Sequence, residues 1–154
     1  MERTLIILKP SAIQRGLAGE VISRFEHKGL HFVGLKMMHL SDDILNEHYA
    51  HLAEKPFFKM LKLSMQTTPV IVACVEGVDA IQVVRTMCGT TNSRDAQPGT
   101  IRGDLSMSKE ANIIHASDSQ ESAEIELKRF FKPEELFDYV PENIHFYYGD
   151  EELN

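Results

Sequence analysis

The sequence predicts an α+β fold in which short strands alternate with helices. Brief runs of β-branched and aliphatic residues recur along the chain, each about as long as a buried strand. Between them lie longer segments whose apolar residues recur every three or four positions, the period of an amphipathic helix. The length of 154 residues fits one domain, because halving it would leave two undersized cores. We therefore predict a single domain over residues 1–154.

Buried strands are predicted where the apolar runs are least interrupted, at residues 4–8 (TLIIL), 32–38 (FVGLKMM), 70–75 (VIVACV) and 112–115 (NIIH). Helical spacing is found over residues 17–28, 41–52, 57–65, 78–88 and 119–131. Ser41 and Ser119 have the chemistry of N-caps, and Gly29 suits a helix end. The tail predicts a short helix over residues 134–139 and an aromatic segment over residues 145–148.

The helical pair over residues 41–65 is an insertion in a familiar order of elements. Without it, the order is βαββαβ, the ferredoxin-like arrangement: an antiparallel four-stranded sheet with its helices on one face. This fold serves many functions and specifies none of them.

Charge is unevenly distributed along the chain, whose formal net charge is −7. Residues 116–154 carry three Lys or Arg against eleven Asp or Glu, whereas residues 85–115 carry four against three. A mildly basic segment in an acidic protein favours a small anionic ligand, although uneven surface charge explains the pattern equally well. The overall acidity argues against a general nucleic-acid binder, which must neutralise phosphates with Lys and Arg.

The N-terminus has no secretory signal, and the apolar runs are far shorter than the ~20 residues that span a bilayer. Cys74 and Cys88 lack zinc-binding spacing and suit a reducing compartment. We therefore expect a cytoplasmic protein with no membrane partner.

Residues 89–111 form a polar segment without periodicity, rich in Thr, Ser, Gly and Asp. A loop longer than about 12–15 residues is uncommon in a compact domain and is usually functional or disordered. It contains Arg94 and Arg102, and guanidinium groups bind phosphate oxygens in pairs. Because the chain lacks both GxxxxGK[ST] and GxGxxG, any phosphate site must be built from side chains.

Two histidine patterns could mark a metal site or a catalytic residue. Glu47-His48-x-x-His51 spaces two imidazoles on one helix, but it lacks the H-E-x-x-H order and an evident third ligand, so we predict no protein metal site. His115 stands between a strand end and a helix start, where α/β proteins tend to bind ligands. Glu126, two turns into that helix, could orient the ring of His115 as a nucleophile. The local pattern alone still favours a structural histidine.

Six motifs, in a fixed order along the chain, favour a functional role for His115 instead. They are Arg3-Thr4-Leu5 through Lys9-Pro10, Gln14-Arg15-Gly16-Leu17-x-Gly19-Glu20, Glu47-His48-Tyr49, Lys55-Pro56-Phe57-Phe58, Pro98-Gly99-Thr100-Ile101-Arg102-Gly103-Asp104 and Asn112-Ile113-Ile114-His115-Ala116-Ser117-Asp118-Ser119. In this order they resemble the nucleoside diphosphate kinases, over about residues 2–140.

The resemblance implies transfer of a γ-phosphoryl group from a nucleoside triphosphate to a nucleoside diphosphate, in two steps through phosphohistidine. It implies His115 as the nucleophile, with Glu126 and Ser117 orienting its ring and Lys9 and Tyr49 near the transferred group. The nucleotide-binding residues it implies are Lys9, Phe57, Leu61, Arg85, Thr91, Arg102 and Asn112. It further implies Mg²⁺ held mainly by the nucleotide phosphates and a homo-oligomer, either tetramer or hexamer. Because stacking on Phe57 would accept any base, we also predict little base discrimination.

Three departures accompany the resemblance. Ala116 stands where many members have glycine, Lys109-Glu110-Ala111 replaces a usual Gly-Arg pair, and the tail from Pro141 to Asn154 is divergent and acidic. Two other functions stay open: a ferredoxin-like regulatory or RNA-binding module that has lost catalysis, and a histidine kinase acting on proteins. The charge of −7 and the missing RNP1-like motif count against RNA.

Overall fold

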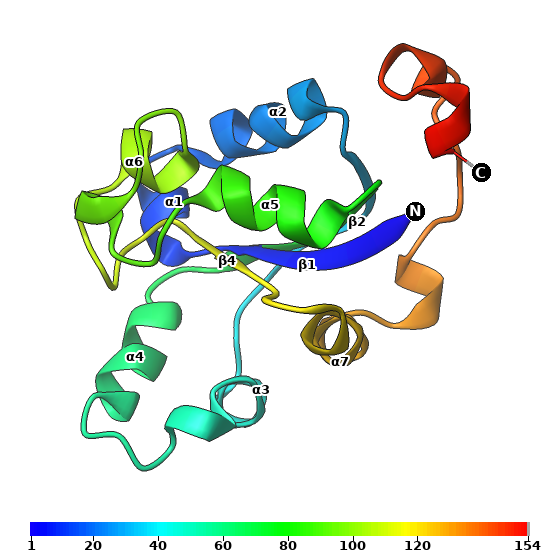
Figure 1. Ribbon diagram of the computed structural model, residues 1–154. Helices are drawn as coiled ribbons and strands as arrows, with labels where there is room; N and C mark the ends of the chain where they lie inside the picture. Colours follow the sequence, from blue (N-terminus) through cyan, green and yellow to red (C-terminus); the bar gives the residue numbers. More distant parts are fainter. Residues whose placement is uncertain (154) are drawn as a thin grey trace.

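Four antiparallel strands form one sheet at the centre of the computed structural model, which describes residues 1–153 (Figure 1). The strands are β1 (Glu2–Leu8), β2 (His31–Met38), β3 (Val70–Gly77) and β4 (Ile114–Ala116). Their order across the sheet is β2-β3-β1-β4, which confirms the predicted ferredoxin-like topology. Only the last residue of the predicted tail, Asn154, lies outside the described residues.

The helices are α1 (Pro10–Gln14), α2 (Ala18–Lys28), α3 (Asp42–His48), α4 (Phe58–Met65), α5 (Ala80–Cys88), α6 (Ile101–Leu105) and α7 (Gln120–Phe130). The expected caps are present, since the hydroxyls of Ser41 and Ser119 accept hydrogen bonds from backbone N–H groups three residues later. Both α1 and α6 were not predicted, because five residues are too few to show helical periodicity. The predicted helix over residues 134–139 is only a 3₁₀ turn, Pro133–Glu135.

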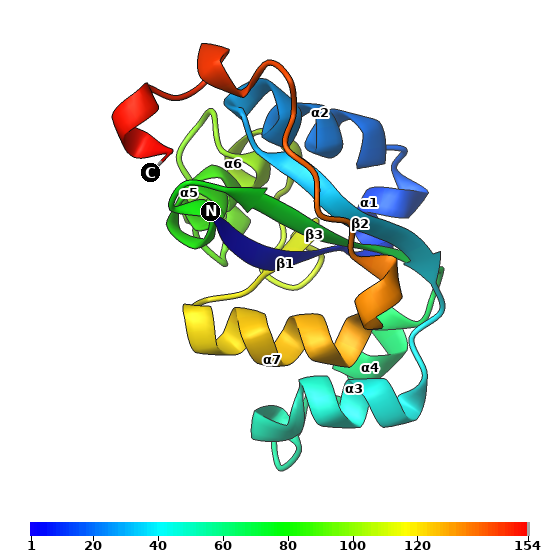
Figure 2. The same ribbon diagram turned by 90° about the vertical axis from the view of Figure 1, so that its right-hand side faces the viewer.

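Helices cover both faces of the sheet (Figure 2). On one face α2 and α5 pack on Ile6 and Leu8 of β1; on the other, α3, α4 and α7 meet Leu5 and Ile7. The expectation of helices on one face therefore holds for α2 and α5, the helices of the βαββαβ frame, but not for the whole chain. The reason lies in the strands: the apolar runs of β1 and β3 do not alternate with polar residues, so each has two apolar faces to bury.

The end of the chain returns to the start of β2. Tyr139 donates a hydrogen bond to the carbonyl of Phe32, and Ile144 is buried. Tyr147 lies so close to Gly29 that a Cβ on this glycine would approach the ring to 2.8 Å. Within residues 1–153 no helix is both long and apolar enough to cross a membrane.

Candidate active site

His115 is placed by the short strand β4 and by the turn that precedes it. In the sheet it lies opposite Ile7 of β1. Before it, the Ile114 N–H bonds to the Asn112 carbonyl at 2.9 Å while Ile113 has φ 76°, which defines a classic γ-turn. A β-branched residue with positive φ is strained, by roughly 1–3 kcal/mol, and the buried side chain of Ile113 keeps it in place. This strained turn fixes the spacing between Asn112 and His115.

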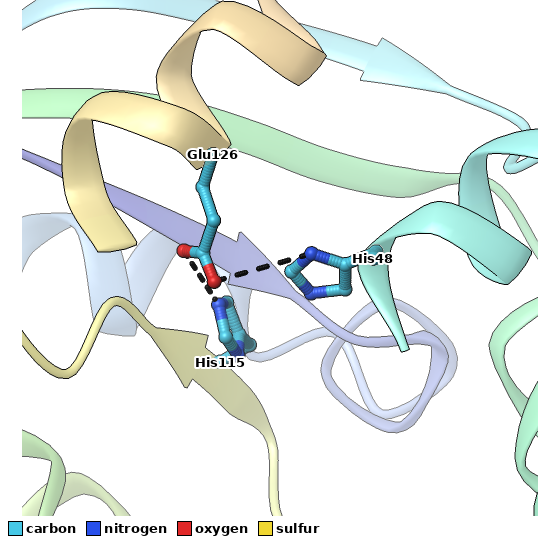
Figure 3. Close-up of side chains that lie close together, drawn as sticks. All are labelled: His48, His115 and Glu126. Atoms are coloured by element: carbon cyan, nitrogen blue, oxygen red, sulfur yellow. Dashed lines mark hydrogen bonds and ion pairs between the residues drawn. The ribbon is translucent and has the colours of Figure 1, made fainter. Parts of the chain in front are cut away.

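The imidazole of His115 is held by a carboxylate from α7 (Figure 3). Its Nε2 lies 3.0 Å from Oε2 of Glu126, and the hydroxyl of Ser117 donates to the same oxygen. Glu126 reaches this position because α7 starts at its Ser119 cap and runs along the face of the sheet below β1 (Figure 2). The trio predicted from the sequence is therefore brought together as expected.

Glu126 is ionised at neutral pH. Burial by itself raises the pKa of its carboxyl group, but hydrogen bonds from His115 and Ser117 and the nearby imidazole charge together lower the pKa below its usual value. An ionised carboxylate accepts hydrogen bonds and does not donate them, so Nε2 of His115 must carry the proton. In the neutral form of the ring the lone pair of Nδ1 is then free, and the side chain of His115 is 22% exposed and so accessible to a ligand.

His48 forms a second layer behind His115. Its ring lies edge-on to that of His115, with the centroids 4.7 Å apart and the planes at 81°. Its Nδ1 accepts a hydrogen bond of 3.0 Å from Arg129 and lies 4.0 Å from Oε1 of Glu126 (Figure 3). Burial, followed by the charge of His115, lowers the pKa of His48 to about 3, so the ring stays neutral.

The sequence placed His48 and His51 on one helix, and the structure separates them. Helix α3 ends at His48, and His51 lies exposed in the 3₁₀ turn Ala50–Leu52. No local pattern indicates that His48 contacts a residue 67 positions later, nor that Arg129 binds it. These two residues of the site were missed for that reason.

A second group of polar residues lies on the other side of the γ-turn. Nζ of Lys9 donates to Oδ1 of Asn112 at 2.7 Å, and the amide of Asn112 donates to the carbonyl of Thr91 at 2.9 Å. Burial, with a smaller contribution from the charge of Arg102, lowers the pKa of Lys9 to about 8. These predicted binding residues are therefore brought together, with Thr91 contributing through its backbone.

Each of the three guanidinium nitrogens of Arg102 donates one hydrogen bond to the protein itself. Its guanidinium donates to the carbonyls of Gly89, Ile114 and Asn112 at 2.7, 2.6 and 3.2 Å. It thereby ties the end of α5 and the long loop to both sides of the strained turn. Arg102 is thus a structural residue as well as a cation beside Lys9.

The other predicted binding residues lie on α5, on α4 and at the end of α3. Arg85 is exposed on α5, and its charge helps to lower the pKa of Asp118, after the larger effect of a hydrogen bond from Ser122. Tyr49 is buried with its ring 4.7 Å from that of His48, and burial raises its pKa to about 12. Phe57 and Leu61 belong to the start of α4, outside both hydrogen-bonded groups, and Phe57 is 49% exposed.

The long loop is ordered and accommodates the departures from the family pattern. Arg94 donates to the carbonyl of Met107, and Ser108 accepts from the backbone N–H groups of Glu110 and Ala111. The unusual residues 109–111 are therefore held in a defined turn. The methyl group of Ala116 packs within the core, so alanine fits where many members have glycine.

These features define a ferredoxin-like α+β protein in which a carboxylate orients an imidazole beside a half-buried lysine and arginine. The sequence matches the nucleoside diphosphate kinase family over residues 2–136. It is 63% identical to a nucleoside diphosphate kinase of Parabacteroides distasonis, over 99% of this chain and all of that protein. It is 51% identical to human nucleoside diphosphate kinase A over 90% of this chain and 91% of that protein.

A solved structure supports the same family assignment. A halophilic nucleoside diphosphate kinase from Halobacterium salinarum, in complex with CDP, superposes with a TM-score of 0.93 at 40% identity, over 96% of this chain and 98% of that one. The chain belongs to the nucleoside diphosphate kinase family, and it is an enzyme of nucleotide phosphoryl transfer.

Proposed function

We propose that this enzyme transfers the γ-phosphoryl group of a nucleoside triphosphate to a nucleoside diphosphate through a phosphohistidine at His115, and so balances the NTP and dNTP pools. The observation that carries this proposal is the hydrogen bond between His115 Nε2 and Glu126. In the neutral imidazole this bond places the proton on Nε2 and leaves the lone pair of Nδ1 available, which is what a nitrogen nucleophile requires.

In the first step, the lone pair of His115 Nδ1 forms a bond to the γ-phosphorus. The bond from that phosphorus to the bridging oxygen breaks, and its electron pair stays on the departing nucleoside diphosphate. Glu126 continues to accept the Nε2 proton, so the phosphorylated ring needs no other proton acceptor. In the second step, a terminal oxygen of another diphosphate attacks the same phosphorus, and Nδ1 is the leaving group.

Phosphoryl transfer depends chiefly on positioning and on stabilising charge on the phosphate oxygens. We assign this role to Lys9, Arg85, Arg102, Thr91 and Tyr49, with Asn112 binding the sugar. Exposed Phe57, with Leu61 beside it, would stack on the base, and stacking accepts any base because each has a π-face. We therefore expect weak base preference.

Mg²⁺ would arrive with the nucleotide. The groups near His115 are mainly cations, an amide and hydroxyls, and the carboxylate that contacts His115, Glu126, already accepts two hydrogen bonds. These residues suit a phosphate-bound Mg²⁺ better than a protein-bound one, because Mg²⁺ prefers oxygen ligands. When bound, the ion would neutralise phosphate charge. We also propose a homo-oligomer acting in the cytoplasm; the buried free thiols Cys74 and Cys88 suit a reducing compartment.

The test is a two-stage labelling experiment. With ATP labelled at the γ-phosphate and Mg²⁺, the protein should acquire acid-labile, base-stable label, and unlabelled GDP or CDP should remove it as the triphosphate. His115→Ala should abolish labelling and keep the fold, whereas His51→Ala, an exposed histidine, should label normally. Label that persists after the chase would favour a protein histidine kinase, and no label would favour a binding module.

A further inference from the structure

His48, His115 and Glu126 form a compact set of potential metal ligands that phosphoryl transfer does not require as a set. One ligand atom from each of these residues lies within 4.8 Å of the others. The set consists of two imidazoles and one carboxylate, a combination that Zn²⁺ accepts with a fourth position left open. We propose that it is an inhibitory site for Zn²⁺ or a similar transition-metal ion.

The distances are near those that a zinc ion requires. Bonds of about 2.0–2.2 Å around a tetrahedral ion place neighbouring ligand atoms roughly 3.3 Å apart. His115 Nε2 is 3.0 Å from one oxygen of Glu126, and His48 Nδ1 is 4.0 Å from the other (Figure 3). The nitrogens of His48 and His115 are at most 4.8 Å apart, so these side chains would have to move closer together to hold an ion.

The lone pair of His48 already faces a positive charge. Its Nδ1 accepts from a guanidinium N–H of Arg129, so the proton of this ring is on Nε2, the form in which Nδ1 can bind a metal. An ion at Nδ1 would replace that N–H. Arg129 would keep its other partner, since its Nε lies 3.2 Å from a carboxylate oxygen of Glu47.

Binding would remove the nucleophile. When the ion takes His115 Nε2, the proton on Nε2 must move to Nδ1, and the lone pair on Nδ1 is lost. No co-reactant is needed, and the ring stays neutral. Mg²⁺ would compete poorly for this site, because it prefers oxygen ligands and imidazole nitrogen suits zinc. Zinc binding itself does not rest on the proposed function, whereas inhibition does.

Calorimetry with Zn²⁺ and the unphosphorylated protein tests the site without turnover. We expect one ion per chain, an absorption band typical of tetrahedral Co²⁺ when cobalt replaces zinc, and inhibition that excess Mg²⁺ does not relieve but a chelator does. His48→Gln should weaken binding by more than the roughly 10–100-fold that loss of a second-shell partner costs. His51→Gln, an exposed histidine three residues later, should bind as the parent does.

A second variant guards against a folding defect in His48→Gln. Arg129→Gln removes the donor that competes for His48 Nδ1, and it should tighten zinc binding more than Lys128→Gln, which removes a neighbouring exposed cation. Unchanged affinity in His48→Gln, or equal affinities in the Arg129 and Lys128 variants, would overturn the proposal. Zinc binding and zinc inhibition that are the same in every variant would point to an adventitious surface ion only.

Discussion

Lys9 is the residue whose charge should set the alkaline limit of activity. Its pKa is about 8, so it is positively charged at pH 7 and loses that charge as the pH rises through 8. Since kcat/KM reports the free enzyme, its value for a cytidine nucleotide should fall above about pH 8. Lys9→Arg keeps a permanent charge and should move this fall to higher pH, even if the overall rate is lower.

The control for this profile is Lys55→Arg, which alters an exposed lysine outside the site. Its pH profile should match that of the parent. If the pH profile of Lys9→Arg falls at the same pH as that of the parent, another group must cause the alkaline fall.

Arg102 should be required for stability as well as for activity. Hydrogen bonds to charged groups contribute roughly 1.5–3 kcal/mol each, and Arg102 makes three of them to backbone carbonyls. Three such bonds sum to about 4.5–9 kcal/mol, but single substitutions rarely cost more than about 4–5 kcal/mol. Arg102→Ala should therefore lower the free energy of unfolding by about 4–5 kcal/mol and also reduce kcat/KM. Denaturant unfolding measures the first effect, and Arg94→Ala, which removes one exposed bond, should show a smaller one. Full stability with lost activity would mean that Arg102 acts on the ligand alone.

At the scale of elements, α7 matters because it delivers Glu126 to His115. Its first turn depends on the Ser119 hydroxyl, which accepts from the Ser122 N–H at 3.1 Å. Ser119→Ala should cost about 1 kcal/mol and lower Tm by about 2–4 °C, with kcat nearly unchanged because Glu126 lies two turns further on. Gln120→Ala, at the next position, should leave Tm close to that of the parent. A large loss of kcat in Ser119→Ala would show that the cap also positions Glu126.

Elements with clear periodicity were predictable from the sequence. The strands and the helices α2, α5 and α7 lie close to their predicted ranges. The contact of Glu126 with His115 was also predictable, because Glu126 lies two turns into a clearly periodic helix. Helix α6 was not, although Thr100 caps it, because five residues inside a polar loop show no repeating apolar face. His48 is the corresponding case within the site: its contact with His115 is tertiary and leaves no trace in local spacing.

At the scale of the whole molecule, the C-terminal tail stabilises the fold at a distance from the site. In both views it lies beside the end of α2, on the side away from α3 and α4 (Figures 1 and 2). Ile144 is buried there, and the hydroxyl of Tyr148 accepts from the Val78 N–H at 3.3 Å.

Truncation after Val140 should therefore lower the free energy of unfolding by about 2–4 kcal/mol, mostly through the lost burial of Ile144 and the tyrosines. We expect kcat to be retained below the new melting temperature. Phe146→Ala alters a side chain that is 90% exposed and should change neither quantity. Lost turnover in a folded truncated protein would give the tail a role in the site or in assembly.

The most direct measurement concerns the atom that carries the phosphate. After brief reaction with ATP and Mg²⁺ and a quench in base, NMR of the isolated peptide should place one phosphoryl group on Nδ1 of His115, because Nε2 is occupied by Glu126. A phosphate on Nε2, on another residue, or on none would contradict the mechanism.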